Sequence, residues 1–258
     1  MLATPEQENI ARAFLAARAE KTPLTLYPGA MPQTMADAYA IQGAAIGFDG
    51  RHVGGWKVGR IAPDLVAHYG SDRIAGPIFA DEITVDGAAM PIYADGFAAA
   101  EAEVLLCLGD VGLGDHDIES VRDCITEVRT GIEIASSPFP DINRHGPAVT
   151  ASDYGNNKGL VLGPPIADWR DRDLITMPVE MTIDGTPVGA ATMETMLDGP
   201  FGSALFLIRT LRARGIVIAP GTWVSAGAIT GVHEIAVGQR AEALFDGKIR
   251  VGCSITGY

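Results

Sequence analysis

The feature that most constrains the fold is an apolar run, residues 100–108, that begins with two glutamates one residue apart, Glu101 and Glu103. The run is short and aliphatic, which predicts a β-strand. Side chains two apart in a strand project from the same face, so both carboxylates point the same way. Like charges placed in this way resist burial unless a cation compensates them. Two interpretations follow: a divalent metal site, or a solvated strand end with two surface glutamates.

The charge balance argues against two classes of partner. Among 258 residues, 32 are Asp or Glu and 19 are Lys or Arg, which gives a formal net charge of −13. Nucleic acids and anionic membranes favour a basic face, so we expect neither as a partner. Three widely spaced cysteines without a CxxC pair indicate reduced core residues of a cytoplasmic protein. We expect no signal peptide and no transmembrane helix, because the required apolar segments are absent from the sequence.

Two helices are predicted near the N-terminus. Thr4, followed by Pro5 and then Gln7, has the pattern of a helix cap with a capping box. Thr34 with Asp37 indicates the start of a second helix. Apolar residues recur after each cap at intervals of three and four, as one buried helix face requires.

After these helices the pattern changes to short strand-like runs bounded by Gly, Pro, Asp and Asn. Predicted strands are residues 55–58, 77–79, 102–108, 132–135, 159–162 and parts of 223–255; predicted helices are residues 118–128 and 200–214. Because strands and helices do not alternate strictly, an α+β fold with a mixed, rolled β core fits better than a doubly wound sheet. We predict a helical N-terminal region over 1–75 and a metal-binding β-roll catalytic domain over 76–258.

Glu133 offers a third carboxylate. In residues 131–135 the two isoleucines share one strand face and Glu133 takes the other, a pattern also typical of a half-exposed strand. Together with Glu101 and Glu103 it predicts an all-oxygen site, which selects a hard cation, Mg²⁺ or Mn²⁺, over Zn²⁺. Such an ion keeps open positions that a chelating substrate can occupy.

Lys57 lies inside a Gly-rich, apolar stretch, residues 54–59. Burying an ammonium is costly unless it meets an anion. Lys57 is therefore a candidate for binding a substrate carboxylate or, with a lowered pKa, for proton transfer. The structural alternative is a lysine that snorkels from a strand.

Two loops offer further ligand contacts. Asn156 and Asn157 carry amide donors and Lys158 follows them, although such a segment beside glycine is also typical of a turn. The small-residue loop 227–231, which contains Thr230, either presents backbone N–H groups to a carboxylate or forms a tight turn. The sequence lacks a nucleophile elbow, a dinucleotide fingerprint and a P-loop, so it gives no support to a serine hydrolase, an NAD enzyme or an ATPase.

In their order along the chain, these residues resemble the 2-keto-4-pentenoate hydratase and 4-oxalocrotonate decarboxylase family, part of the fumarylacetoacetate hydrolase superfamily. The resemblance covers about residues 34–255. Its motifs are Lys57 in Gly-Trp-Lys-Val-Gly, the Glu101–Glu103 pair, Glu133 in Gly-Ile-Glu-Ile, Asp153 before a small-residue turn, and Ser225 in Ser-Ala-Gly-Ala.

The resemblance implies a helical N-terminal region on a mixed β-roll, a homo-oligomer, and Mg²⁺ or Mn²⁺ held by Glu101, Glu103 and Glu133. It also implies the pocket residues Lys57 and Asp81, which we predict to act in catalysis. Our candidates for substrate binding are Asp153, Asn156, Asn157, Lys158 and Thr230. The chain departs from the family pattern after Glu133 and after Asp153, where Asn156, Asn157 and Lys158 replace small serine-type residues. We therefore expect this loop to select a substrate with a polar or anionic group beyond its 2-oxo acid head.

The implied function is a metal-dependent lyase that adds water to a short 2-oxo or 2-hydroxydienoic acid in aromatic-compound catabolism. Three alternatives stay open: decarboxylation of a 4-oxalocrotonate-like acid, C–C hydrolysis of an acylpyruvate, and a non-catalytic accessory or ligand-binding subunit with an altered pocket. The implied partners are a small 2-oxo acid, further copies of the chain and a related subunit of the same pathway.

Overall fold

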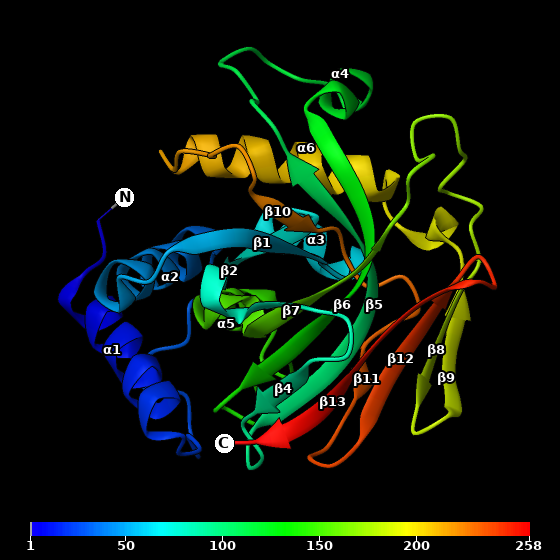
Figure 1. The fold of residues 1–258 in the computed structure, drawn as a ribbon. Coiled ribbons are helices and arrows are strands. Elements are labelled where there is room, and N and C mark those ends of the chain that lie inside the picture. The colour runs from blue at the N-terminus through cyan, green and yellow to red at the C-terminus, as the bar shows by residue number, and fades with distance from the viewer. Residues whose placement is uncertain (1) are drawn as a thin grey trace.

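Two curled β-sheets form the centre of the molecule (Figure 1). The computed structural model describes residues 2–258. The larger sheet contains β1 (Val53–Arg60), β2 (Arg73–Phe79), β3 (Ile83–Val85), β5 (Phe97–Leu108), β6 (Ile125–Ser137), β7 (Asn157–Pro165), β10 (Trp223–Ser225) and β11 (His233–Glu234). The smaller sheet contains β4 (Ala89–Ile92), β8 (Val179–Ile183), β9 (Thr186–Ala191), β12 (Arg240–Phe245) and β13 (Ile249–Gly257).

Both sheets mix parallel and antiparallel pairs. The larger sheet has the order β2-β1-β10-β5-β6-β7-β3, with β11 paired to β5, and the smaller has the order β4-β13-β12-β8-β9. The prediction of helices combined with a mixed, curled β core is confirmed. The division into 1–75 and 76–258 stays a prediction; its boundary falls within β2, which pairs with β1.

The helices lie around the sheets, with α1 and α2 together at one side of the larger sheet and α6 across one end (Figure 1). Their bounds are α1 (Pro5–Glu20), α2 (Met35–Asp49), α3 (Pro63–Tyr69), α4 (Ile118–Asp123), α5 (Pro147–Ser152) and α6 (Gly199–Ala213). Short 3₁₀ turns are η1 (Ala80–Glu82), η2 (Tyr154–Asn156) and η3 (Met193–Thr195). Within the described residues, no helix has the length and apolar character needed to cross a membrane.

The predicted helix caps are confirmed. Thr4 accepts a hydrogen bond from the Gln7 backbone N–H within a complete capping box, and Thr34 accepts one from the Asp37 backbone N–H. The helix predicted over residues 118–128 is wrong in its second half, because α4 ends at Asp123 and the chain continues as β6. Alternating β-branched residues after that point favour a strand, which pairs with β5.

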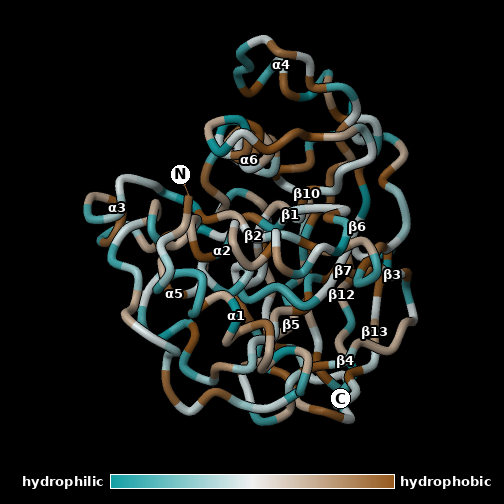
Figure 2. Tube along the Cα trace, turned by 90° about the vertical axis from the view of Figure 1, so that its left-hand side faces the viewer, coloured by the Kyte–Doolittle hydropathy of each residue, from teal (hydrophilic) through white to brown (hydrophobic). Residues whose placement is uncertain are grey.

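Most apolar side chains gather in one continuous core between the sheets and under α6. In Figure 2 hydrophobic segments recur along α6 and the strands. A second cluster joins the N-terminal helices to this body: Phe14 of α1 packs with Tyr27, and Phe79 of β2 packs edge-on against Tyr154 of η2. The first helix thus lies against the segments that precede β7.

A close backbone approach between β2 and η2 generates a stability prediction. A Cβ atom on Gly76 would lie 2.1 Å from the carbonyl oxygen of Tyr154. Gly76→Ala should therefore lower the free energy of unfolding by about 1–3 kcal/mol, because backbone has to move. Gly43→Ala is the control: nothing lies within 4 Å of that Cβ on α2, so the change should be neutral or stabilising by up to about 1 kcal/mol. Urea unfolding measures both, and equal stability of the two variants would contradict the close approach.

Candidate active site

Three buried glutamates meet on the paired strands β5 and β6. Glu101 lies directly opposite Glu133 in the antiparallel register, and Glu103 lies opposite Gly131. All three are buried, and one carboxylate oxygen from each lies within 4.8 Å of the others. The two-residue period of the strand therefore brings the carboxylates together, as the sequence predicted. The alternative of a solvated strand end is wrong, because these side chains are inside the protein.

Glu103 has one carboxylate oxygen held by the protein and one free. Its Oε2 accepts hydrogen bonds from Ser225 Oγ at 2.5 Å and from the Gly227 backbone N–H at 2.8 Å. Its Oε1 is buried and has no hydrogen-bond partner among the described residues. A buried carboxylate oxygen without a partner is costly unless a cation or a donor meets it.

Glu133 repeats this arrangement. Its Oε1 accepts a hydrogen bond from Asn157 Nδ2 at 2.8 Å and lies 3.2 Å from Lys57 Nζ. Its Oε2 is buried and has no partner among the described residues. In both Glu103 and Glu133 the protein thus fixes one carboxylate oxygen and leaves the other without a partner. Supporting contacts around a metal site hold the ligands in the same way.

The electrostatics of the cluster fit a divalent cation. Burial and the neighbouring carboxylates raise the pKa of Glu103 well above its usual range. Burial also raises the pKa of Glu101 to about 7, against the opposing effect of the Lys57 charge. Three ionised carboxylates and one ammonium leave two negative charges, which one Mg²⁺ or Mn²⁺ would balance. The all-oxygen donor set suits such hard ions.

Lys57 is protonated in this environment. Burial alone would lower the pKa of Lys57, but the charges of Glu133, Glu101 and Glu103 outweigh that effect and raise it. The hypothesis of a lysine with a lowered pKa is therefore wrong for the cluster as the structure has it. Lys57 is thus a buried cation held beside the carboxylates.

A cavity of about 680 Å³ opens beside the cluster. Lys57, Glu101 and Asn156 are among the residues that line it. The rest of its wall mixes apolar and polar side chains, with residues from the end of β1, from α3, from the segment after η3 and from the loop that follows β10. A cavity that combines apolar walls with a few charged and polar groups is typical of a small-molecule site.

The three residues of the predicted loop after Asp153, namely Asn156, Asn157 and Lys158, make different contacts. Asn156 lines the cavity, where its Oδ1 lies 3.4 Å from Lys57 Nζ and its Nδ2 donates to Asn143 Oδ1 at 3.1 Å. Asn157 is buried behind it and donates to Glu133 instead of reaching the cavity. Lys158 is also buried, and its ammonium pairs with Glu82.

Asp153 makes structural contacts between elements of the fold. It pairs with Arg18 of α1 at 2.7 Å and accepts a hydrogen bond from Ser137 Oγ at 2.6 Å. Arg18 also donates to the carbonyl oxygens of Asn157, at 3.4 Å, and Ser136, at 3.5 Å. The first helix thereby ties β6 to β7 beside the glutamate cluster, a contact that sequence reasoning missed.

Besides Asn157, four predicted pocket residues are not brought to the cavity. Asp81 is exposed and lies 3.4 Å from Arg51, and Thr230 bonds His233 at 3.1 Å. Neither of these, nor Asp153 or Lys158, belongs to the described residues that line the cavity. Their roles in catalysis or substrate binding stay predictions without support from this geometry.

Comparisons with known proteins agree with the predicted family. No family model matches the chain. Two curated relatives, 2-keto-4-pentenoate hydratase from Paraburkholderia xenovorans (strain LB400) and 2-keto-4-pentenoate hydratase 3 from Pseudomonas putida, are each 25% identical over 252 residues, which is 95% of this chain and 93% of theirs. The resemblance to the 2-keto-4-pentenoate hydratase and 4-oxalocrotonate decarboxylase family is confirmed.

Solved structures agree on the fold. The 4-oxalocrotonate decarboxylase from Pseudomonas putida G7, complexed with magnesium and adipate, has a TM-score of 0.82, with 22% identity over 99% of both chains. The fumarylpyruvate hydrolase from Pseudomonas aeruginosa, in complex with Mn²⁺ and pyruvate, has a TM-score of 0.56, with 15% identity over 79% of this chain and 89% of that one. Both were solved with a divalent ion, in keeping with the carboxylate cluster.

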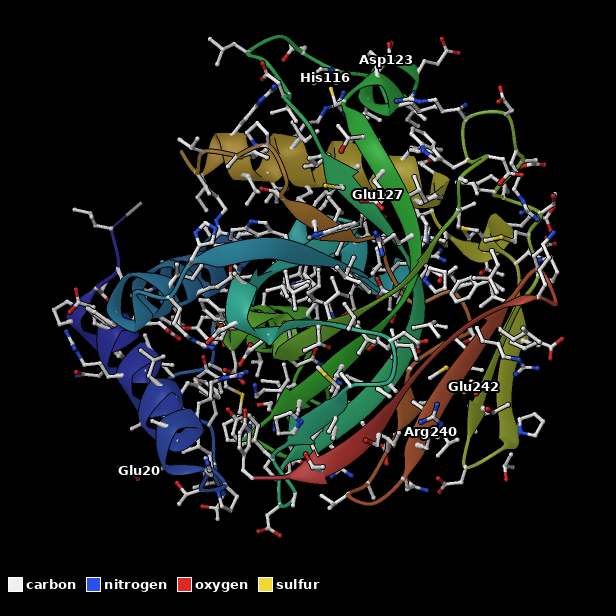
Figure 3. All side chains as sticks on the ribbon, viewed as in Figure 1. Glu20, His116, Asp123, Glu127, Arg240 and Glu242 are labelled. Atoms are coloured by element: carbon white, nitrogen blue, oxygen red, sulfur yellow. The ribbon has the colours of Figure 1, made fainter. Side chains whose placement is uncertain are left out.

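Removal of one carboxylate tests the metal site. Glu103→Gln keeps the shape of the side chain but removes a charge, so it should weaken Mg²⁺ or Mn²⁺ binding at least about tenfold while the fold remains. Calorimetric titration with Mn²⁺ measures the affinity. The control is Glu127→Gln, a half-buried glutamate on β6 that pairs with Arg129 and lies toward α4 (Figure 3). Unchanged metal affinity in Glu103→Gln would show the assignment to be wrong.

Proposed function

We propose that the chain is a divalent-metal-dependent lyase that adds water to a short 2-oxo or 2-hydroxydienoic acid. The observation that carries this proposal is the buried glutamate cluster with two unpartnered oxygens beside a substrate-sized cavity. Glu101, Glu103 and Glu133 would hold Mg²⁺ or Mn²⁺. The names of the two curated hydratases support the reaction type, and a role in aromatic-compound catabolism in the cytoplasm follows from the same family.

A bound divalent ion would supply a Lewis acid that polarises a 2-oxo group and stabilises negative charge as it develops there. Lys57 contributes a fixed ammonium at the cavity end, where it can hold an anionic substrate oxygen and donate a proton. Asn156 beside it orients the ligand through its amide. A 2-hydroxy-2,4-dienoate first ketonises: the 2-hydroxyl proton is lost, C5 gains a proton and the double bond moves to C3–C4. Water then adds across C3–C4, with its oxygen bonding to C4 and a proton ending on C3, and the product is a 4-hydroxy-2-oxo acid.

Decarboxylation is the competing reaction, and the structural match to a 4-oxalocrotonate decarboxylase favours it as the second candidate. Product analysis separates the two. Purified protein with Mg²⁺ or Mn²⁺ should convert 2-hydroxypenta-2,4-dienoate or its dicarboxylate analogue to a 4-hydroxy-2-oxo acid, seen by NMR, without release of CO₂. Release of CO₂ would favour the decarboxylase, and no metal-dependent turnover of either compound would leave the non-catalytic alternative.

We expect Lys57 to be needed for activity and not for folding. Lys57→Met preserves the stem and deletes the charge, so we expect a folded, metal-binding protein with at least about 100-fold lower activity, the size of a lost acid–base or anion contact. The matched change is Lys158→Met, because Lys158 is equally buried and pairs with Glu82 away from the cavity. It should lower activity less than about tenfold. Full activity of Lys57→Met in steady-state assays would refute the role of this lysine.

We also propose that the protein works as a homo-oligomer, alone or with a related subunit of the same pathway. The family resemblance supports this assembly. Sedimentation at micromolar concentration should therefore find a species several times heavier than the 27.0 kDa chain. A single species at the mass of one chain would contradict it.

A further inference from the structure

Two arginines on neighbouring strands line the cavity. Arg60, the last residue of β1, is the register partner of Arg73, the first residue of β2, and both line the cavity. Arg73 is committed to the framework: it is buried, lies 3.0 Å from Asp72 and 3.5 Å from Asp198, and donates to the Leu197 carbonyl oxygen. These contacts fix the segment between η3 and α6.

Arg60 differs from its neighbour because its charge is not paired. Its Nη1 donates to the Thr195 carbonyl oxygen at 3.2 Å, and it forms no ion pair within the described residues. A guanidinium carries five N–H donors in a planar fork, so one main-chain contact leaves most of them open. The contact with Thr195 also holds the side chain at the cavity wall.

The cavity therefore carries positive charge at two separate places. Lys57 lines it together with Glu101 of the carboxylate cluster, and Arg60, three residues further along β1, lies roughly 10 Å from Lys57 by strand geometry. The wall between them includes apolar side chains such as Ile74 and Met196. Two carboxylates without an ion pair within the described residues also line this space: Glu101 of the cluster and the exposed Glu234 of β11.

We propose that Arg60 is a specificity-determining residue that binds a second, distal anionic group of the ligand. The inference rests on the proposed function for the 2-oxo acid head, and it makes the natural substrate a dianionic 2-oxo acid. A carboxylate matches the guanidinium fork in a paired, charge-assisted contact that an apolar tail cannot make. This contact takes the place of Lys158, which the sequence suggested for the same task and which is bound to Glu82.

Two six-carbon probes test the proposal on the Mn²⁺-loaded protein. Adipate carries a carboxylate at both ends and hexanoate at one end, so their affinities by calorimetric titration differ through the distal group. The parent protein should bind adipate at least about tenfold more tightly than hexanoate. Arg60→Met should lower adipate affinity to that of hexanoate and leave hexanoate unchanged, whereas Arg60→Lys should retain part of the preference.

The control is Arg209→Met. Arg209 of α6 also donates to one main-chain oxygen, that of His116 at 2.8 Å, and it does not line the cavity (His116 is labelled in Figure 3). Adipate and hexanoate should each bind Arg209→Met with the same affinity as they bind the parent protein. Equal affinity of adipate and hexanoate for the parent, or an equal loss of both in Arg60→Met, would overturn the proposal; the latter would make Arg60 a structural contact of Thr195.

Turnover separates this inference from the proposed function. With a dicarboxylate dienoate, Arg60→Met should raise KM about tenfold or more with little change in kcat, and with 2-hydroxypenta-2,4-dienoate it should change neither. If an Arg60-dependent preference for adipate exists but no dienoate is converted, anion recognition stands and the lyase proposal falls. If dienoates are converted with equal efficiency whatever their distal group, the lyase stands and this inference falls.

Discussion

The structure depends on the burial of three carboxylates around one ammonium. Glu101, Glu103 and Glu133 lie on two paired strands in the middle of the larger sheet, where water cannot compensate their charge. Lys57 offsets one charge, and two carboxylate oxygens still lack a partner. Such a cluster is costly without a further cation. The protein alone does not supply that cation, and a bound ligand would. Such a cost is typical of functional sites, in agreement with the proposed role of a cation here.

Precision at this site comes from polar contacts that arrive from distant parts of the chain. Ser225 and Gly227 fix one carboxylate, and Asn157 fixes another. The β6–β7 register shifts between Ile134 and Ala135, next to the strand position that pairs with Asn157. Arg18 of α1 spans the same place, so the N-terminal helix acts on the geometry of the site through the backbone of β7.

Sequence reasoning succeeded where a local period determines geometry. The two-residue repeat of a strand was enough to place Glu101 and Glu103 on one face, and helix caps were read from their spacing. Its pocket assignments lack support where tertiary packing decides: Lys158 pairs with Glu82 and does not line the cavity, and Asp81 is exposed. Arg60 carried no sequence signal beyond its distance from Lys57, because its orientation depends on how β1 ends against η3.

The cations that line the cavity also matter because the net charge of the protein is negative, whereas the proposed ligand is an anion. A chain with a formal charge of −13 repels an anionic ligand at long range. At physiological ionic strength that repulsion is screened beyond about 8 Å, so the groups lining the cavity decide what enters. Lys57 and Arg60 bring positive charge to its lining, and Glu101 and Glu234 bring negative charge. The proposed selectivity for an anion is thus a local property of the cavity, opposite to what the net charge of the molecule favours.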